Sequence, residues 1–173
     1  MAEKQKILEF SELQRQKVII IAALVTAMGF IDATALNVAL PFIQSSLNAS
    51  ATDIHWVLEI YLLFLAALMM AGGALGDTLG RRRPLRWGVA FFALTSFACA
   101  VSPSAEWLIF FRAAQGISAA LMIPASLALI NAAFPPDERG IAIGRWSAIV
   151  AIAIPIGPLV GGLAVDYLSW HFV

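Results

Sequence analysis

Five long apolar segments, separated by short polar stretches, constrain this chain more than any other feature of its sequence. Each is close to the roughly 20 residues that an α-helix needs to cross about 30 Å of hydrocarbon. Backbone polar groups in lipid must be paired within the protein, and the segments lack β-type alternation, so each is predicted to be a transmembrane helix. The expected helices cover about residues 18–40, 56–75, 85–101, 107–132 and 141–165.

The composition agrees with a membrane protein. Hydrophobic residues make up 61% of the 173 residues and charged residues only 13%, against about 25% charged in a typical soluble domain. The polar stretches between the apolar segments are too short to form domains of their own. We therefore expect an all-α, polytopic helix bundle, in which residues 1–17 form a polar tail and residues 18–173 form one transmembrane domain.

Basic residues are distributed unevenly between the polar stretches. Lys and Arg occur in the tail (1–17), in the second loop region (81–86) and in the fourth (135–145), but neither in the first loop (41–55) nor in the third (102–106). Because Lys and Arg remain on the cytoplasmic side, this asymmetry predicts a cytoplasmic N-terminus in a multi-pass protein of the cell membrane.

The sequence gives no sign of an enzyme, a metal site or a cofactor. The single Cys, Cys99, lies in an apolar segment, and His55 and His171 lie far apart, so neither a disulfide framework nor metal-ligand spacing is present. A glycine-rich stretch follows the second apolar segment, but it lacks the Lys followed by Ser or Thr of a phosphate-binding loop. We expect no cofactor and no nucleic-acid partner.

Three charged residues lie within the outer half of the expected membrane spans: Asp32, Glu59 and Arg112. Burying such a charge costs roughly 2.5–3.5 kcal/mol on insertion scales, so these residues are expected to have a partner or a function. With a rise of about 1.5 Å per residue, they lie at similar depths in the outer half of the bilayer, which permits a cluster. All three are candidate proton-coupling residues. Alternatively, Glu59 forms a structural ion pair with Arg112 or reaches interfacial water.

The stretch GGALGDTLGRRRP joins the second and third apolar segments. Gly73 and Gly76 are expected to let another helix approach closely, and Gly80 to permit a left-handed backbone at the helix end. The helix macrodipole disfavours an anion at Asp77, so a cation should compensate it, and Arg81 is the nearest. The alternative is a basic loop that only sets topology, with an incidental Asp77.

This loop resembles the motif between the second and third helices of the major facilitator superfamily. The matching residues are Gly73, Asp77, Gly80, Arg81 and Arg82, whereas Thr78 replaces a usual basic residue. FIDATALNVALP is similar to the first-helix signature of the fourteen-span drug:proton antiporters, FRAAQGISAA to an Arg-x-x-Gln-Gly motif, and PIGPLVGG to the antiporter motif of the fifth helix. The principal matches in these three are Asp32, Thr34, Asn37, Arg112, Gln115, Gly116, Gly157, Pro158, Gly161 and Gly162.

The resemblance covers nearly the whole chain, but a complete family member has twelve or fourteen spans. It therefore implies an incomplete N-terminal half of a major facilitator fold, with C-terminal helices missing. It also implies that the loop acts as a conformational latch, in which Asp77 engages a helix of the second half and the arginines can pair with Asp137 or Glu138. The antiporter motif would seal the bundle against leak, with helix packing alone as the alternative, and Pro158 should bend its helix.

Asp32 and Asn37 are about 140° apart around their helix, so they cannot face the same direction. The resemblance puts Asp32 in a cavity, and Asn37 and Gln115 are candidates for contact with the cavity or the substrate. A partly apolar cavity favours a protonated carboxyl group, whereas a nearby Arg112 favours the ionised form. Asp32 is thus the first candidate for the proton carrier and Glu59 the second.

We expect part of a secondary transporter that exports small amphipathic compounds of the multidrug type in exchange for protons. Its expected partners are the lipid bilayer, the small-molecule substrate, protons and the missing helices. A transporter of metabolites or organic anions from the same superfamily is one alternative, with Arg112 serving the charge of the substrate. A non-transporting membrane fragment or an assembly partner is another.

Overall fold

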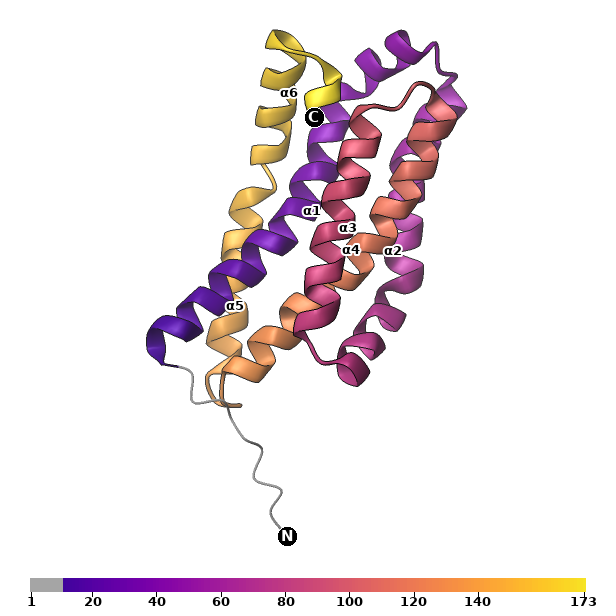
Figure 1. Cartoon of the computed structure of the whole chain (residues 1–173). Helices are drawn as coiled ribbons and strands as arrows, with labels where there is room; N and C mark the ends of the chain where they lie inside the picture. The colour runs from indigo at the N-terminus through magenta and orange to yellow at the C-terminus, as the bar shows by residue number, and fades with distance from the viewer. Residues whose placement is uncertain (1–10) are drawn as a thin grey trace.

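The structure is a computed structural model that describes residues 11–173, so most of the expected polar tail lies outside the described residues. It confirms the predicted all-α bundle, and no strand occurs in the described part of the chain. The helices run side by side in Figure 1. They are α1 (Glu12–Leu47), α2 (Ala51–Leu79), α3 (Arg82–Ala100), α4 (Ala105–Ala133), α5 (Arg139–Ala153) and α6 (Ile156–Tyr167), followed by the short 3₁₀ turn η1 (Trp170–Phe172).

Several helices extend beyond the apolar segments that predicted them, because polar capping residues lie outside those segments. Ser11 and Gln14 form a capping box at the start of α1, in which Gln14 N donates to Ser11 Oγ at 3.3 Å and Ser11 N to Gln14 Oε1 at 2.9 Å. Ser50 and Asp53 form the same arrangement at the start of α2. Gly80 ends α2 with a positive φ of 81°, as the sequence predicted.

Among residues 11–173, four helical units are long and apolar enough to cross a membrane: α1, α2, α4 and the segment Arg139–Tyr167 that comprises α5 and α6. α3 is not among them because its first five residues are Arg-Arg-Pro-Leu-Arg, which lower its mean hydropathy. It nevertheless packs along α4 as a member of the bundle. Length and hydropathy therefore support four of the five expected spans, and the exact count of five is not confirmed.

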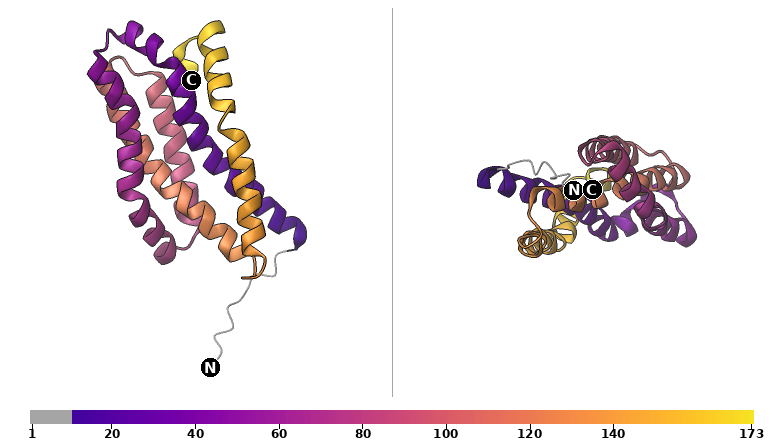
Figure 2. Two further views of the ribbon diagram at one scale, coloured as in Figure 1. Left: turned by 180° about the vertical axis from the view of Figure 1, so that it is seen from behind. Right: turned by 90° about the horizontal axis from the view of Figure 1, so that it is seen from below.

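α1 and α4 connect the two sides of the bundle. α4 packs most extensively against α2 and α3, whereas α1 packs against α5, α6 and α4. Figure 2 shows α5 and α6 on one side of the molecule, away from α2 and α3. Side chains between α1 and α4 therefore lie in the interior, and this is where the candidate site is found.

α2 approaches α4 most closely at Gly72, rather than at Gly73 or Gly76. A Cβ atom on Gly72 would collide with the Ala120 carbonyl group. The nearest neighbour of such an atom on Gly73 would be Pro124 Cβ at 3.8 Å, and a Cβ on Gly76 would meet nothing within 4 Å. Within this bundle, neither Gly73 nor Gly76 is the point of close approach that the sequence predicted: Gly73 makes only an ordinary contact with α4, and at Gly76, which shares the face of Gly72 one turn later, no neighbouring helix comes close.

Gly157 and Gly161 of α6 pack directly against α1. A Cβ atom on Gly157 would collide with the Thr34 side chain, and one on Gly161 would lie 2.6 Å from the Ala35 carbonyl oxygen. Residues four apart share one helix face, so the two glycines form a single contact strip. Their expected close packing is confirmed.

The last membrane-length segment is interrupted after Ala153. Pro158 has no N–H to donate to the Ile154 carbonyl one turn earlier, and Pro155 lies within the interruption itself. The Thr34 hydroxyl, which also reaches carbonyl groups of its own helix, lies 3.2 Å from the Ile154 oxygen. The bend expected from Pro158 is present, and the contributions of Pro155 and Thr34 were not anticipated.

Candidate functional site

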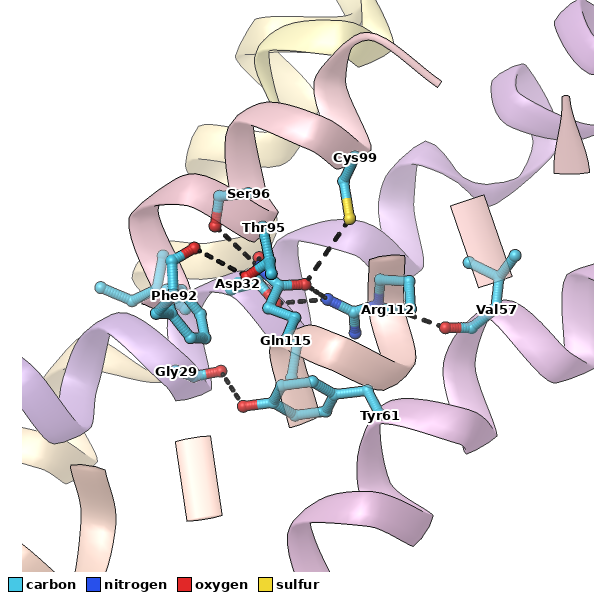
Figure 3. A network of polar contacts seen from close by, with 12 residues as sticks. Gly29, Asp32, Val57, Tyr61, Phe92, Thr95, Ser96, Cys99, Arg112 and Gln115 are labelled. Carbon is cyan, nitrogen blue, oxygen red and sulfur yellow. Dashed lines mark hydrogen bonds and ion pairs between the residues drawn. The ribbon is translucent and has the colours of Figure 1, made fainter. Parts of the chain in front are cut away.

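Asp32 of α1 and Arg112 of α4 form an ion pair in the interior of the bundle. Arg112 Nη1 lies 2.5 Å from Asp32 Oδ2, and the side chains are 2% and 19% exposed, respectively. The pair lies at the centre of the polar network in Figure 3. Arg112 therefore pairs with Asp32, and its alternative pairing with Glu59 is wrong.

Gln115 connects both members of this pair to α3. Its Nε2 donates to Asp32 Oδ1 at 2.8 Å and lies 2.8 Å from Ser96 Oγ, while its Oε1 accepts a hydrogen bond from Arg112 Nη1 at 2.5 Å. Cys99 Sγ lies 3.9 Å from the same Oε1. Arg112 and Gln115 are three residues apart on α4 and so share one face. Both carboxylate oxygens of Asp32 are therefore engaged by α4.

Arg112 has two further partners on α2. Its Nε donates to the Val57 carbonyl oxygen at 3.2 Å, and its Cζ lies 4.5 Å from the centre of the Tyr61 ring. A guanidinium group over an aromatic face is attracted by the ring quadrupole. The Tyr61 hydroxyl donates to the Gly29 carbonyl oxygen of α1 at 3.3 Å. The charge of Arg112 is thus surrounded by groups from α1, α2 and α4 (Figure 3).

Asp32 lines two cavities. The larger has a volume of about 590 Å³ and lies among α1, α3, α5 and α6, with Asp32 and Ser96 as its polar side chains and apolar residues elsewhere. The smaller, of about 80 Å³, is lined by Arg112 and Gln115 as well as by Asp32 and Ser96. The carboxylate is therefore open to a mainly apolar space while it remains bound to Arg112.

Glu59 and Asn37 lie outside this network. Glu59 is exposed on α2 and takes part in none of the ion pairs found among residues 11–173. Asn37 is exposed, and its Nδ2 donates to the Ala33 carbonyl oxygen of its own helix at 3.1 Å. The expected difference in direction between Asp32 and Asn37 is present, and only Asp32 lines a cavity described above.

The candidate latch loop between α2 and α3 makes no ion pair within residues 11–173. Asp77 and Arg82 are exposed and Arg81 is half-buried, so the expected compensation of Asp77 by Arg81 is not formed. Glu138, an expected partner of the loop arginines, is instead 3.1 Å from Arg15 Nη1 of α1. Arg15 lies at the start of α1, next to the loop that carries Glu138, and therefore forms the ion pair with Glu138 in place of the loop arginines.

The antiporter motif does not join the polar network, but it packs on the turn of α1 that carries Asp32. A Cβ atom on Gly157 would lie 2.8 Å from the Ile31 carbonyl oxygen. The packing at Gly162 is less tight, since a Cβ atom added there would lie 3.9 Å from a Val38 methyl group. Together with Gly161 and Pro158, these residues hold α6 against α1.

Sequence reasoning missed Tyr61 and Ser96. Both are polar side chains within apolar segments, and a polar group in a span usually has a partner there. That signal was available for each residue, but it does not name the partner. Within residues 11–173, no group of three or more His, Cys, Asp or Glu side chains could hold a metal ion.

The arrangement of helices and motifs can be compared with known proteins. A family model described as the Major Facilitator Superfamily matches residues 22–173. The chain belongs to the major facilitator superfamily. The resemblance seen in the sequence motifs is therefore confirmed.

Similar superfamily members are named for drug resistance or export. The chain is 41% identical over 146 residues to the tetracenomycin C resistance and export protein of Streptomyces glaucescens, covering 84% of this chain and 27% of that protein. It is 42% identical over 156 residues to the methylenomycin A resistance protein of Streptomyces coelicolor, covering 88% and 33%. It is 44% identical over 147 residues to the multidrug resistance protein Stp of Mycobacterium tuberculosis, covering 84% and 27%.

Solved structures of the superfamily have the same helix arrangement. A bacterial homologue of the human lysosomal transporter Spinster, in an inward-facing and unoccupied conformation, superimposes with a TM-score of 0.79 at 25% identity and covers 94% of this chain and 37% of that one. The occupied inward-facing form gives a TM-score of 0.80. The chain thus spans about a third of the length of the relatives it matches.

Proposed function

We propose that this bundle serves proton-coupled export of small amphipathic compounds, as part of a secondary transporter that contains further helices. One observation carries the proposal: the Asp32 carboxylate is bound to a buried Arg112 and at the same time lines a mainly apolar cavity of about 590 Å³. Such a cavity suits an amphipathic compound, because apolar walls with few polar groups are typical of small-molecule sites. The resistance and export names of the relatives support the same class of substrate.

Asp32 is the proposed proton carrier. It is the acid that lines the larger cavity, and it is at the same time bound to a buried cation, Arg112. When Asp32 is protonated, Arg112 keeps Gln115 Oε1 and the Val57 carbonyl oxygen as acceptors. Protonation would therefore leave Arg112 with two neutral acceptors in place of its ion pair. In the proposed cycle, a proton enters on Asp32 as the exported compound leaves.

In the proposed topology, α3 crosses the cell membrane in addition to the four membrane-length units, which makes five spans. The N-terminus lies on the cytoplasmic side. Its support is the distribution of Lys and Arg, which occur in the N-terminal tail and around the α2–α3 and α4–α5 loops but not in the other two loops. The arginines that lower the hydropathy of α3 lie at its N-terminal end, where side chains of this length reach the membrane surface.

Transport by a secondary transporter requires one half to move against the other around a site near the membrane midplane. The relatives are much longer than this chain, which covers 27–33% of three of them. We therefore expect residues 1–173 alone not to transport. Purified chain in proteoliposomes should show no proton-coupled dye movement. Saturable transport in this assay would contradict the expectation.

An organic-anion transporter has less support. Arg112 would have to meet the anion, but its side chain is 2% exposed, and Asp32, Gln115 and Val57 already accept its hydrogen bonds. It is also absent from the lining of the larger cavity. A role as a non-transporting assembly partner remains compatible with the fold, and the transport experiment below tests it.

The decisive experiment uses a chimera in which residues 1–173 replace the matching segment of a full-length relative such as Stp. Asp32→Asn keeps the shape and much of the hydrogen bonding of the side chain but removes its titration. We expect pH-driven efflux to fall to the level of vesicles without the protein, while substrate binding persists and loses its pH dependence. Asp166→Asn is the matched control, because Asp166 is an exposed acid near the end of α6.

Two results would reject the proposal. Normal pH-driven efflux by a well-expressed Asp32→Asn chimera would show that Asp32 is not the proton carrier, and Glu59 would become the better candidate. A parent chimera that inserts correctly but neither binds nor moves any amphipathic compound would favour the non-transporting role.

A further inference from the structure

Tyr61 contacts both sides of the ion-pair network, although it belongs to none of the four sequence motifs. Its ring lies 4.5 Å from Arg112 Cζ, its hydroxyl reaches the Gly29 carbonyl oxygen of α1, and the residue is only 1% exposed (Figure 3). We propose that Tyr61 is a positioning residue for proton exchange at Asp32. Its ring holds the Arg112 guanidinium in the orientation that directs Nη1 to the carboxylate. This inference rests on the proposed role of Asp32 in proton coupling.

The backbone around Tyr61 fixes the position of the ring. A Cβ atom on Gly116 of α4 would collide with the Tyr61 carbonyl oxygen, so α2 and α4 meet here backbone to backbone. At the other end of the side chain, a Cβ atom on Gly29 would lie 3.2 Å from the Tyr61 hydroxyl. The residue is thus confined between α4 at its backbone and α1 at its hydroxyl. A confined ring is a rigid support for the guanidinium above it.

Arg112 needs such a support because an arginine side chain has many rotamers, and fixing them costs entropy. Its Nε bond to Val57 and its Nη1 bonds to Asp32 and Gln115 restrict the guanidinium, and its Cζ lies over the Tyr61 ring. Without the ring, the guanidinium would lose a favourable contact and gain freedom to rotate. The contact between Arg112 and Asp32 would then be weaker on average.

The sign of the effect follows from the charges. Arg112 stabilises the ionised form of Asp32, so a weaker contact must make the carboxyl group take up its proton at a higher pH. Other titratable groups around the site line the smaller cavity: Cys99 of α3 and His171 of η1. Their contributions are present in every variant and are removed by comparison with Asp32→Asn.

The test measures protonation rather than transport. Residues 1–173 are purified in lipid nanodiscs, and the infrared band of the protonated carboxyl group is followed against pH, with Asp32 assigned by subtraction of the Asp32→Asn spectrum. We expect Tyr61→Leu to raise the titration midpoint of Asp32 by about half a pH unit or more, since a cation–π contact is worth about 0.5–2 kcal/mol and one unit about 1.4 kcal/mol. Tyr61→Phe, which keeps the ring, should retain the wild-type midpoint.

Tyr167→Leu is the matched control, because it makes the same substitution at a tyrosine that is 80% exposed on α6. It should leave the midpoint unchanged. Size-exclusion profiles and thermal unfolding show whether each variant is folded, and Tyr61→Met replaces the ring by a long flexible side chain if Tyr61→Leu is not folded.

An unchanged midpoint in a folded Tyr61→Leu or Tyr61→Met variant would overturn the proposal. An equal shift in Tyr61→Phe would also overturn it, since the effect would then belong to the hydroxyl bond with Gly29 rather than to the ring. Failure of the proposed function is a separate result. It would appear as normal efflux by the Asp32→Asn chimera, and it does not depend on how the Tyr61 variants change the titration midpoint.

Discussion

Arg112 is almost completely buried, whereas about a fifth of the side chain of its partner Asp32 is exposed. The arginine is held by acceptors from three helices, and the acid faces a cavity. The two members of the pair therefore have different roles: Arg112 is the fixed charge, and Asp32 is the member that a proton or a ligand can reach.

Replacement of Arg112 by Ala should be far more damaging than replacement of Glu59 by Gln. Removing one member of a buried ion pair leaves the other uncompensated, at a typical cost of 3–5 kcal/mol, about as much as we expect for Arg112→Ala. Glu59 is exposed and forms no ion pair in the described part of the chain, so Glu59→Gln should change the free energy of unfolding by no more than about 0.5 kcal/mol. Chemical unfolding in detergent measures both values. Equal losses would contradict the assignment of Asp32 as the partner of Arg112.

Gly72 and Gly76 provide a matched pair of substitutions on one helix. Gly72→Ala places a methyl group against the Ala120 carbonyl, and such overpacking should cost about 1–3 kcal/mol. Gly76→Ala meets no atom within 4 Å and should instead stabilise α2 by up to about 1 kcal/mol, because Ala is the better helix former. Thermal unfolding of the two variants decides between the packing seen here and a contact centred on Gly76, for which the order would be reversed.

Gly157→Ala should separate α6 from α1. Its methyl group would have to displace the Thr34 side chain and would lie 2.8 Å from the Ile31 carbonyl oxygen, so we expect a loss of about 1–3 kcal/mol. Gly144→Ala on α5 is the control, since nothing lies within 4 Å of that position. A disulfide cross-link or a spin-label distance between α1 and α6 would report the separation. An unchanged distance together with unchanged stability would argue against tight packing at Gly157.

The orientation in the membrane can be tested with introduced cysteines in a Cys99→Ala background. Ser46 lies near the end of α1 and Thr78 near the end of α2, and both are exposed. A membrane-impermeant thiol reagent should label Ser46→Cys from outside the cell and Thr78→Cys only after the cytoplasmic side is opened. The opposite pattern would place the N-terminus outside.

Depth in the membrane could be predicted from the sequence, but rotation about each helix axis could not. Depth follows from the rise per residue, so the convergence of Asp32 and Arg112 was foreseeable as one of the permitted clusters. Choosing between Asp32 and Glu59 required the direction in which α2 points Glu59, and that direction is fixed by packing against α4. The same limitation explains Gly72, which is one residue, or about 100° of rotation, from the position predicted for close approach.

Contacts distant in sequence were also beyond prediction. Arg15 reaches Glu138 across 123 residues, and nothing in either local sequence identifies the other. The helices themselves were predictable because hydrophobic length and capping residues act locally. The latch loop was predicted from a resemblance, and its ion pairs are not formed within the described residues.

The hydroxyl of Thr34 has a mechanical consequence. The Ile154 carbonyl lacks the donor that Pro158 would supply in an unbroken helix, and it accepts a hydrogen bond from Gly157 N at 3.2 Å instead. Thr34 lies 3.2 Å from that oxygen and two residues from Asp32. A tilt of α6 relative to α5 would therefore change a contact on the same turn of α1 that carries the carboxylate. The bend at the proline is thus in contact with α1 less than one helical turn from the acid that is proposed to carry the proton.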